Sequence, residues 1–388
     1  KMKILQISKP VLPIHADMKY GGIERVIRDL DEEFVKLGHE SYIVAPADSI
    51  IKGKLIPSTK NGAWDNNGGI FYNENQKQKA LKIHTSVAIE AINQIMPDAI
   101  HDHLPLIIRE QYLKSGLKNP MLTTLHGSLH SENGMSSIPN PTPSIIYPHN
   151  HFNSISESQR SFFSELIPVE FNVYNSICVK DYPYQEEKRD YFLSLGKIGI
   201  NKGQDTAIRV ARDLGKKLVI AGPVHAFRGP IKDFWKERVE PCVDEFHLDI
   251  PANQIDQFTK EFSKKDYGKN GRVIYIGEVD DSQKKEWFKY SKCFLMPIRW
   301  HEPFGLVMIE AMATGTPVIS YNMGAVPEIV VHGRTGFVIP AENYKSFRDS
   351  VKEIQHIKAK DCRKHVEYNF DVKKQAEKYI NIFKYILN

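Results

Sequence analysis

Residues 293–320, with the sequence CFLMPIRWHEPFGLVMIEAMATGTPVIS, restrict the folds open to this chain more than any other segment does. Residues 293–297 are apolar, as in a short strand, and residues 305–314 show the apolar period of a half-buried helix. Gly315 stands where a left-handed C-terminal cap is expected, and Pro317 prevents the helix from continuing. The segment therefore predicts a strand, a polar loop, a helix and a second strand, which is the order of a βαβ unit in a parallel sheet.

The polar loop of this unit lies where parallel sheets bind ligands, at the carboxyl end of a strand. It contains Glu302, and Glu310 follows inside the helix. The free amides of Phe304, Gly305 and Leu306 at the helix start would favour an oxygen-rich or anionic ligand. An ionised Glu310 could accept hydrogen bonds from a diol. Both acids could instead be solvated residues at the start and on the surface of the helix.

A series of short motifs resembles the retaining glycosyltransferase family 4. Residues 302–318, EPFGLVMIEAMATGTPV, are similar to its E-x7-E signature. Further motifs follow the order of that family: KYGGIERV (19–26), TLHG (124–127), YNSI (174–177), LGKIGINKG (195–203), YIGEVDD (275–281) and GAVPEIV (324–330). The ordered series covers nearly the whole chain and looks closest to a subgroup that includes an avilamycin-pathway glycosyltransferase.

The resemblance implies the GT-B fold, in which two Rossmann-like, doubly wound α/β domains face each other across a cleft and a C-terminal helix crosses back to the N-terminal domain. The strand–helix alternation and the length of 388 residues independently predict two domains with mostly parallel sheets. We expect residues 1–175, with the helix 371–388, to form the acceptor-binding domain, and residues 176–370 to bind the nucleotide-sugar donor. The charged stretch 181–190 is interpreted as the linker between them.

By resemblance, the residues around the two acids bind the donor. Glu302 and the loop through Phe304, Gly305 and Leu306 would bind hydroxyls of the donor sugar, and Glu310 would hold the ribose hydroxyls. Residues that border the base would be Glu278 and Val279.

Two lysines in GKIGINKG, Lys197 and Lys202, are candidates to stabilise the departing diphosphate. The family usually has arginine where Lys197 stands, and lysine lacks the bidentate fork of a guanidinium. Arg160 and Arg299 are therefore candidates to share this role. Each lysine could also be a solvated surface charge.

In the N-terminal half, Gly21 and Gly22 precede a predicted helix whose amides could hold phosphates, although a simple turn explains them equally well. His126 follows a predicted strand, and the resemblance implies that it lies near the anomeric centre and C6 group of the donor sugar. Histidines 101 and 103 flank Asp102, a pattern that could bind a metal but that we interpret as buried hydrogen bonding at a strand end.

The function that the resemblance implies is a retaining, metal-independent transfer of a hexose-type sugar from a nucleoside diphosphate, with UDP preferred. The acceptor would be a hydroxyl of a glycan, a lipid-linked glycan or a small molecule, surrounded by the loops 57–69 and 128–151. We expect no cofactor besides the nucleotide sugar as co-substrate. A non-catalytic protein that binds nucleotide sugars or glycans, or a nucleotide-sugar epimerase on the same fold, remains an alternative. A dehydrogenase is disfavoured, because the GxGxxG turn is absent after the first strand.

Composition limits the partners. The formal net charge of +5 is scattered, without the basic blocks of a nucleic-acid binder. The four cysteines lie far apart without a CxxC pair, as expected in a reducing compartment. With neither a secretion signal nor an apolar run of about 20 residues, we expect a cytoplasmic protein, compatible with peripheral contact at the inner face of a membrane.

Overall fold

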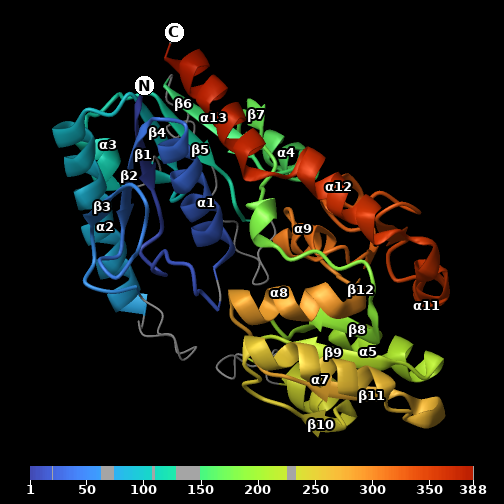
Figure 1. Cartoon of the computed structure of the whole chain (residues 1–388). Coiled ribbons are helices and arrows are strands. Elements are labelled where there is room, and N and C mark those ends of the chain that lie inside the picture. The colour runs from blue at the N-terminus through green and yellow to red at the C-terminus, as the bar shows by residue number, and fades with distance from the viewer. Residues whose placement is uncertain (20, 63–73, 107–109, 128–148, 225–232, 388) are drawn as a thin grey trace. The chain divides into compact units, whose positions relative to one another are not determined.

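The computed structural model describes residues 1–19, 21–62, 74–106, 110–127, 149–224 and 233–387 (Figure 1). The chain divides into two compact units. The first contains Lys1–Ile177 and Val372–Asn388, and the second contains Cys178–Asp371. Within the described residues, each unit is an α/β domain around its own sheet of seven parallel strands, as the strand–helix alternation predicted.

The first sheet has the strand order β3-β2-β1-β4-β5-β6-β7, so the order reverses between β1 and β4, as in a Rossmann fold. The chain leaves β1 toward one side of the sheet and later returns to pair β4 with the other side of β1. Its strands are β1 (Lys3–Ile7), β2 (Glu40–Ala45), β3 (Lys54–Pro57), β4 (Ala99–Asp102), β5 (Met121–Thr124), β6 (Asn150–Ser154) and β7 (Phe171–Asn172).

Helices cover both faces of the first sheet. Its helices are α1 (Gly22–Lys36), α2 (Glu74–Ile95), α3 (Glu110–Ser115), α4 (Glu157–Ser164) and α13 (Val372–Ile386). Leu5 and Ile7 of β1 share a core with Ala88 of α2, whereas Gln6 between them reaches the carbonyl of Ile27 on α1. The period of two along β1 thus directs alternate side chains to opposite helix layers.

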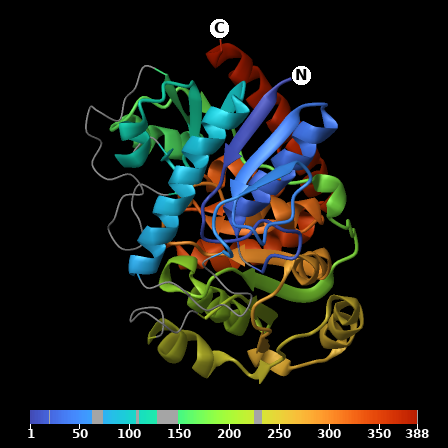
Figure 2. The ribbon, with the colours of Figure 1, turned by 90° about the vertical axis from the view of Figure 1, so that its left-hand side faces the viewer.

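The C-terminal helix α13 belongs to the first unit although the second unit precedes it in the chain. Phe383 of α13 is buried, and its ring lies 6.2 Å from the ring of Phe34 on α1. Both views show α13, in red, running beside the N-terminal part of the chain (Figures 1 and 2). The prediction that the last helix returns to the N-terminal domain is confirmed.

The second sheet has the order β10-β11-β9-β8-β12-β13-β14, a Rossmann order with the short strand β10 added at one edge. Its strands are β8 (Arg189–Leu195), β9 (Lys217–Ala221), β10 (Glu245–Phe246), β11 (Arg272–Tyr275), β12 (Ser291–Met296), β13 (Val318–Tyr321) and β14 (Gly336–Ile339). Its helices are α5 (Gln204–Leu214), α7 (Ala252–Lys264), α8 (Asp281–Tyr290), α9 (Leu306–Ala313), α10 (Val326–Ile329), α11 (Tyr344–Glu353) and α12 (Ala359–Asn369).

The βαβ unit predicted from residues 293–320 is present as β12, α9 and β13. Gly315 has a φ of +87°, so the left-handed cap expected there is confirmed. Helix α9 is buried along most of its length because strand β13 and helices α8 and α12 pack around it.

The interpretation of residues 181–190 as a linker is wrong. The chain passes between the units at Ile177 and Cys178, and strand β8 already begins at Arg189. Lys188 donates through Nζ to the carbonyl oxygens of Lys289 and Thr314, at 2.9 Å each. The charged stretch lacks an apolar face, but its long side chains reach acceptors inside the second unit.

Candidate functional site

An ion pair at the carboxyl edge of the second sheet joins two loops that are far apart in sequence. Nζ of Lys202 lies 2.9 Å from Oε2 of Glu302, across a sequence separation of 100 residues. The indole Nε1 of Trp300 donates to the same oxygen at 3.1 Å, and the Lys202 ammonium lies 4.6 Å from the centre of the Trp300 ring. Glu302 is 9% exposed, so its carboxylate is held in one place rather than solvated.

Glycines allow these two loops to approach each other. Gly203, at a φ of +73°, is the N-cap residue of α5, and a Cβ there would lie 2.1 Å from the carbonyl oxygen of Pro297, the residue that follows β12. Gly324 has a φ of +63°, and a Cβ would lie 2.3 Å from the carbonyl oxygen of Glu302. Ala325 donates its amide to that same carbonyl at 2.9 Å. The main chain around Glu302 is thus fixed from two sides.

The predicted sugar-binding loop ends at the N-terminus of α9. Gly305, with a φ of +86°, is the N-cap residue and Leu306 the first helical residue. The side chain of Phe304 is 1% exposed and its ring lies 5.9 Å from that of Phe370. Phe304 could therefore meet a ligand only through its backbone.

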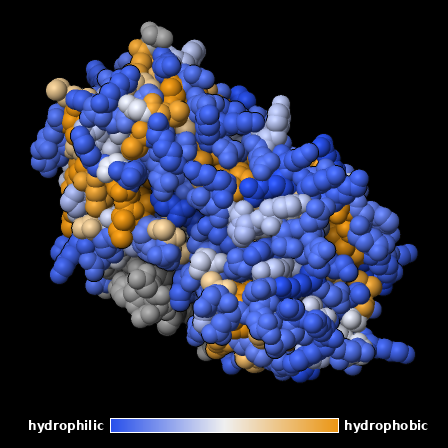
Figure 3. Space-filling view, in the orientation of Figure 1, coloured by the Kyte–Doolittle hydropathy of each residue, from blue (hydrophilic) through white to orange (hydrophobic). Residues whose placement is uncertain are grey.

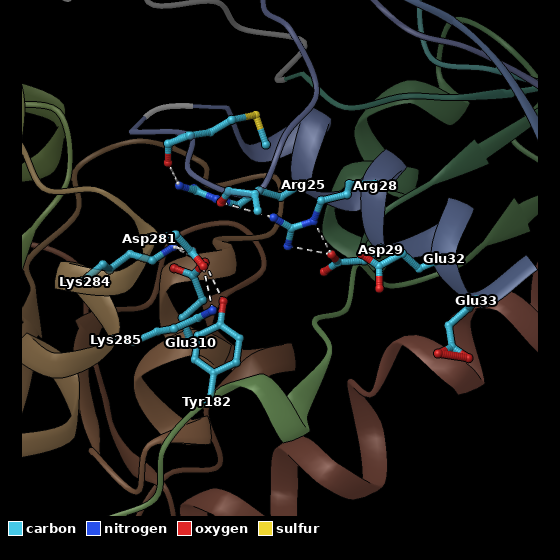
Figure 4. Close-up of polar contacts among 12 residues, drawn as sticks. Arg25, Arg28, Asp29, Glu32, Glu33, Tyr182, Asp281, Lys284, Lys285 and Glu310 are labelled. Atoms are coloured by element: carbon cyan, nitrogen blue, oxygen red, sulfur yellow. Dashed lines mark hydrogen bonds and ion pairs between the residues drawn. The ribbon is translucent and has the colours of Figure 1, made fainter. Parts of the chain in front are cut away.

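Glu310 is 1% exposed and belongs to a buried charge cluster (Figure 4). Its Oε1 lies 2.5 Å from Nζ of Lys284 and accepts the hydroxyl of Tyr182 at 3.2 Å. Asp281 lies 3.2 Å from Lys284 and 2.6 Å from Lys285. The alternative that Glu302 and Glu310 are solvated helix residues is therefore wrong.

Sequence reasoning missed Lys284 and Tyr182 as partners of Glu310. The spacing of Asp281 and Lys284, three residues apart on α8, was a visible signal for an ion pair on one helix. Nothing in the sequence indicated that Tyr182, before β8, would reach α9.

The remaining donor-side candidates lie on the same edge of the sheet. Lys197 follows β8, and its carbonyl accepts the Gln204 side chain at 3.1 Å. Glu278 and Val279 follow β11, and Val279 is buried. Asp280 then caps α8 with a capping box.

The two arginines considered as substitutes are engaged in structural contacts. Arg299 donates to Asp205 at 3.0 Å and to Thr206 at 2.7 Å. Arg160 belongs to the other unit and donates to the carbonyl of Val169 at 3.1 Å. These contacts favour Lys202 over either arginine as the cation at the carboxyl edge of the second sheet.

In the first unit, the glycine pair begins α1, with Gly21 as N-cap at a φ of +128° and Gly22 as first helical residue. Arg25 donates to the carbonyl of Met18 at 2.6 Å, which ties the preceding loop to the helix (Figure 4). The buried carboxylate of Glu24 lies 2.9 Å from where a Cβ on Gly21 would stand, and burial raises the pKa of Glu24. A carboxyl group of the chain itself therefore lies at the helix start where a phosphate was expected.

Three histidines lie together at the carboxyl ends of β4 and β5. Nδ1 of His103 lies 2.8 Å from Nε2 of His126, and Nε2 of His101 lies 2.7 Å from Oγ1 of Thr124. The interpretation of His101 and His103 as buried hydrogen-bonding residues is confirmed. Within the described ranges, no group of three or more His, Cys, Asp or Glu side chains is arranged to hold a metal ion.

These imidazoles are neutral at pH 7. Burial lowers the pKa of His101 to about 3 and lowers the pKa of His103 and His126 well below 6.5. The charge of Lys9 lowers the pKa of His103 and His126 further. His126 can therefore act as a neutral hydrogen-bonding group rather than as a cation.

Two family models match the two units in turn. Residues 20–165 match the model described as Glycosyltransferase Family 4, and residues 183–372 match the model described as Glycosyl transferases group 1. The chain belongs to glycosyltransferase family 4, as its motif series predicted.

Known proteins resemble this chain at low identity. The alpha-1,3/1,6-mannosyltransferase ALG2 of Dictyostelium discoideum is 28% identical over 213 residues, which are 51% of this chain and 43% of that protein. Three curated relatives, ALG2 among them, are matched over 39%, 43% and 53% of their own lengths, so the chain spans about half of these relatives or less.

Solved structures match over the full length. AviGT4, a glycosyltransferase involved in avilamycin A biosynthesis, has a TM-score of 0.61 at 19% identity, with 100% of this chain and 98% of that chain covered. Anabaena HepE, solved in complex with UDP and glucose, has a TM-score of 0.66 at 15% identity, with 99% of this chain and 100% of that chain covered. These likenesses show that the chain has the GT-B fold.

Replacing Gly203 tests the close approach that brings Lys202 to Glu302. We expect Gly203→Ala to lower the free energy of unfolding in urea by at least about 2 kcal/mol, because of the positive φ and the contact with Pro297. Gly199→Ala is the matched control, since Gly199 is extended and no atom lies within 4 Å of its added Cβ. Equal effects of the two substitutions would contradict this account.

The buried histidines predict a dependence of stability on pH. His101 has a folded pKa of about 3, below the unfolded value near 6.5, so the stability it contributes above pH 6.5 is lost as the pH falls toward 3. From pH 6.5 to 5, the free energy of unfolding should fall about 2 kcal/mol more in the wild type than in His101→Gln. Parallel pH profiles of the two proteins would show that His101 does not stay neutral in the folded state.

Proposed function

We propose that this chain is a retaining, metal-independent glycosyltransferase that moves a hexose-type sugar from a nucleoside diphosphate to a hydroxyl acceptor. The observation that carries the proposal is the Lys202–Glu302 pair at the N-terminus of α9, with Glu310 buried on the same helix. A cation, a fixed carboxylate and free helix amides on one edge of a parallel sheet suit a ligand with both phosphates and hydroxyls.

Lys202 would stabilise the diphosphate as it departs, with Lys197 as a second cation. An ammonium has three N–H donors, and Lys202 uses one on Glu302. Charge stabilisation of this kind is a major source of catalysis when a leaving group becomes negative.

The carboxylates would orient the donor. Glu302 would accept hydrogen bonds from sugar hydroxyls beside the amides of Gly305 and Leu306. Glu310 would accept the ribose hydroxyls, while Lys284 and Tyr182 hold its Oε1. Glu278 and Val279 would border the base.

UDP is our preferred nucleotide. HepE, which shares the fold, was solved with UDP and glucose, and this supports a UDP-sugar donor.

The family implies that the anomeric configuration is retained. A double displacement needs a carboxylate nucleophile beneath the anomeric carbon. Glu302 is bonded to Lys202 and Trp300 through one oxygen, which favours a hydrogen-bonding role. We therefore propose a front-face route in which the leaving phosphate oxygen takes the acceptor proton.

We propose that the first unit binds the acceptor, a glycan or a lipid-linked glycan. Most of the two loops expected to surround it, residues 63–69 and 128–148, lies outside the described residues. In the first unit, His126 would contact a sugar, whereas the Glu24 carboxyl at the start of α1 argues against a phosphate at Gly21 and Gly22. All four cysteines are free, which agrees with a reducing, cytoplasmic location.

Peripheral membrane contact forms part of this proposal. No helix within the described ranges is long and apolar enough to cross a bilayer. Apolar residues gather over the part of the first unit that carries α2 and α3 (Figure 3). Ile83 and Leu113 are 42% and 37% exposed there, with the exposed Lys79 and Lys82 on α2 nearby in sequence.

Vesicle sedimentation tests this contact. Replacing Ile83 and Leu113 together with serine should reduce binding to anionic vesicles about tenfold or more, because buried aliphatic side chains contribute about 1.5–3 kcal/mol each. Leu166→Ser is the control, since Leu166 of the first unit is similarly exposed, at 40%. Absence of vesicle binding by the wild type would remove the membrane from the proposal.

The transferase activity itself is tested by incubating the protein with UDP-hexoses in the presence of EDTA and measuring the released nucleoside diphosphate by mass spectrometry. We expect Glu302→Gln to lose about 100-fold or more in turnover, because a charged contact to the reacting sugar is removed. Glu261→Gln, an exposed site on α7, should have wild-type turnover.

Other outcomes would favour other functions. Binding without turnover in the wild type would favour a non-catalytic binder, and an altered sugar with intact nucleotide would favour an epimerase. Activity restored only by added metal would contradict metal independence.

A further inference from the structure

His103 has a buried nitrogen that the proposed reaction does not use. The residue follows β4 and is 1% exposed. Its Nδ1 faces Nε2 of His126 at 2.8 Å, while its own Nε2 is buried without a hydrogen-bond partner among the described residues. The ring of His101 packs against it at a centroid distance of 4.0 Å, with the two ring planes tilted by 44°.

This geometry discriminates between two proton arrangements. Burial and Lys9 keep both imidazoles neutral, so each ring carries one proton and only one of the two facing nitrogens is protonated. If His126 were the donor, the single proton of His103 would be on Nε2, as a buried N–H without an acceptor. If His103 is the donor, its proton is on Nδ1, and its buried Nε2 carries only a lone pair. Buried donors without acceptors are rarer and more costly than buried acceptors without donors.

We propose that His103 is a positioning residue that donates Nδ1–H to Nε2 of His126 and thereby fixes His126 as a hydrogen-bond donor through Nδ1. The two nitrogens of an imidazole point in different directions, so the proton on Nδ1 of His126 faces away from His103. A group held in this form recognises an acceptor oxygen, such as a sugar hydroxyl, ring or phosphate oxygen, rather than a cation or a hydrogen-bond donor.

The surroundings of His103 hold this arrangement in place. His101 is anchored on one side by its bond to Oγ1 of Thr124. His101 also packs against Tyr379 of α13, at a ring distance of 4.4 Å. The C-terminal helix thus supports the contact of His101 with His103, which in turn sets the orientation of the His126 ring. The role of this contact in sugar transfer rests on the proposed function, whereas the tautomer itself does not.

The tautomer can be measured directly. In protein labelled with ¹⁵N-histidine, long-range ¹H–¹⁵N correlation spectra distinguish an Nδ1–H from an Nε2–H imidazole, and the His126 signal is assigned by its loss in His126→Gln. We expect the Nδ1–H form for His126 at pH 7. An Nε2–H form in the wild type would overturn the proposal without any variant having to fold.

Variants of His103 test the positioning. His103→Phe removes the donor, and His126 should then show a mixture of tautomers. His103→Asn places an amide N–H near the former Nδ1 and should restore the Nδ1–H form. His84→Phe is the matched control: His84 is another fully buried histidine of the first unit, bonded to Ser58 and to the carbonyl of Ser8. His84→Phe should leave the His126 tautomer unchanged.

Kinetics with UDP-hexose separate this inference from the proposed function. His103→Phe should lower kcat about tenfold with little change in KM, and His103→Asn should recover most of it. If the wild type neither binds nor turns over nucleotide sugars, the proposed function fails while the tautomer measurement still decides the inference. Full activity with mixed tautomers in His103→Phe would overturn the positioning role.

Discussion

The close approach of two turns at the carboxyl edge of the second sheet sets the geometry of the candidate donor site. The turn before α5 meets the end of β12 with so little space that a Cβ on Gly203 would lie 2.1 Å from the carbonyl oxygen of Pro297. Because the backbones touch, the side chains that follow each strand are brought together. Lys202 then reaches Glu302, and Glu302 lies beside the first turn of α9. The chemistry attributed to the site depends on this one contact between neighbouring parallel strands.

Glu310 shows how the fold holds a charge inside the protein. A buried carboxylate is costly unless it is paired, and removing one partner of a buried pair typically costs about 3–5 kcal/mol. Lys284 and Tyr182 both engage the same oxygen of Glu310. The pairing limits the rotation of the carboxylate, which is what recognition of a diol requires. The neutral histidines of the first unit follow the opposite strategy, since burial there removes charge and leaves directed hydrogen bonds.

Local patterns in the sequence predicted the elements well, because period, caps and turn glycines act over a few residues. The βαβ unit around α9 and the return of α13 to the first unit are examples. Contacts between distant side chains could not be predicted in this way. Tyr182 and Lys284 meet Glu310 only because three elements converge, and the bond from His103 to His126 depends on the register of β4 and β5. The stretch 181–190 was misread as a linker because its composition is polar, although Lys188 is bonded inside the second unit.

Calorimetric titration of nucleoside diphosphates tests the central claim most directly. UDP, GDP and ADP would each be titrated into the wild type and into Glu310→Gln, together with the 2′,3′-dideoxy form of whichever nucleotide binds. We expect that one nucleotide binds and that loss of the ribose diol weakens its binding to the wild type about 10–100-fold, as hydrogen bonds to a charged group are lost. In Glu310→Gln, removal of the ribose diol should have little further effect on nucleotide affinity. Absence of binding by all three nucleotides, or an equal effect of the missing diol in both proteins, would contradict the assignment of this edge of the sheet as the nucleotide site.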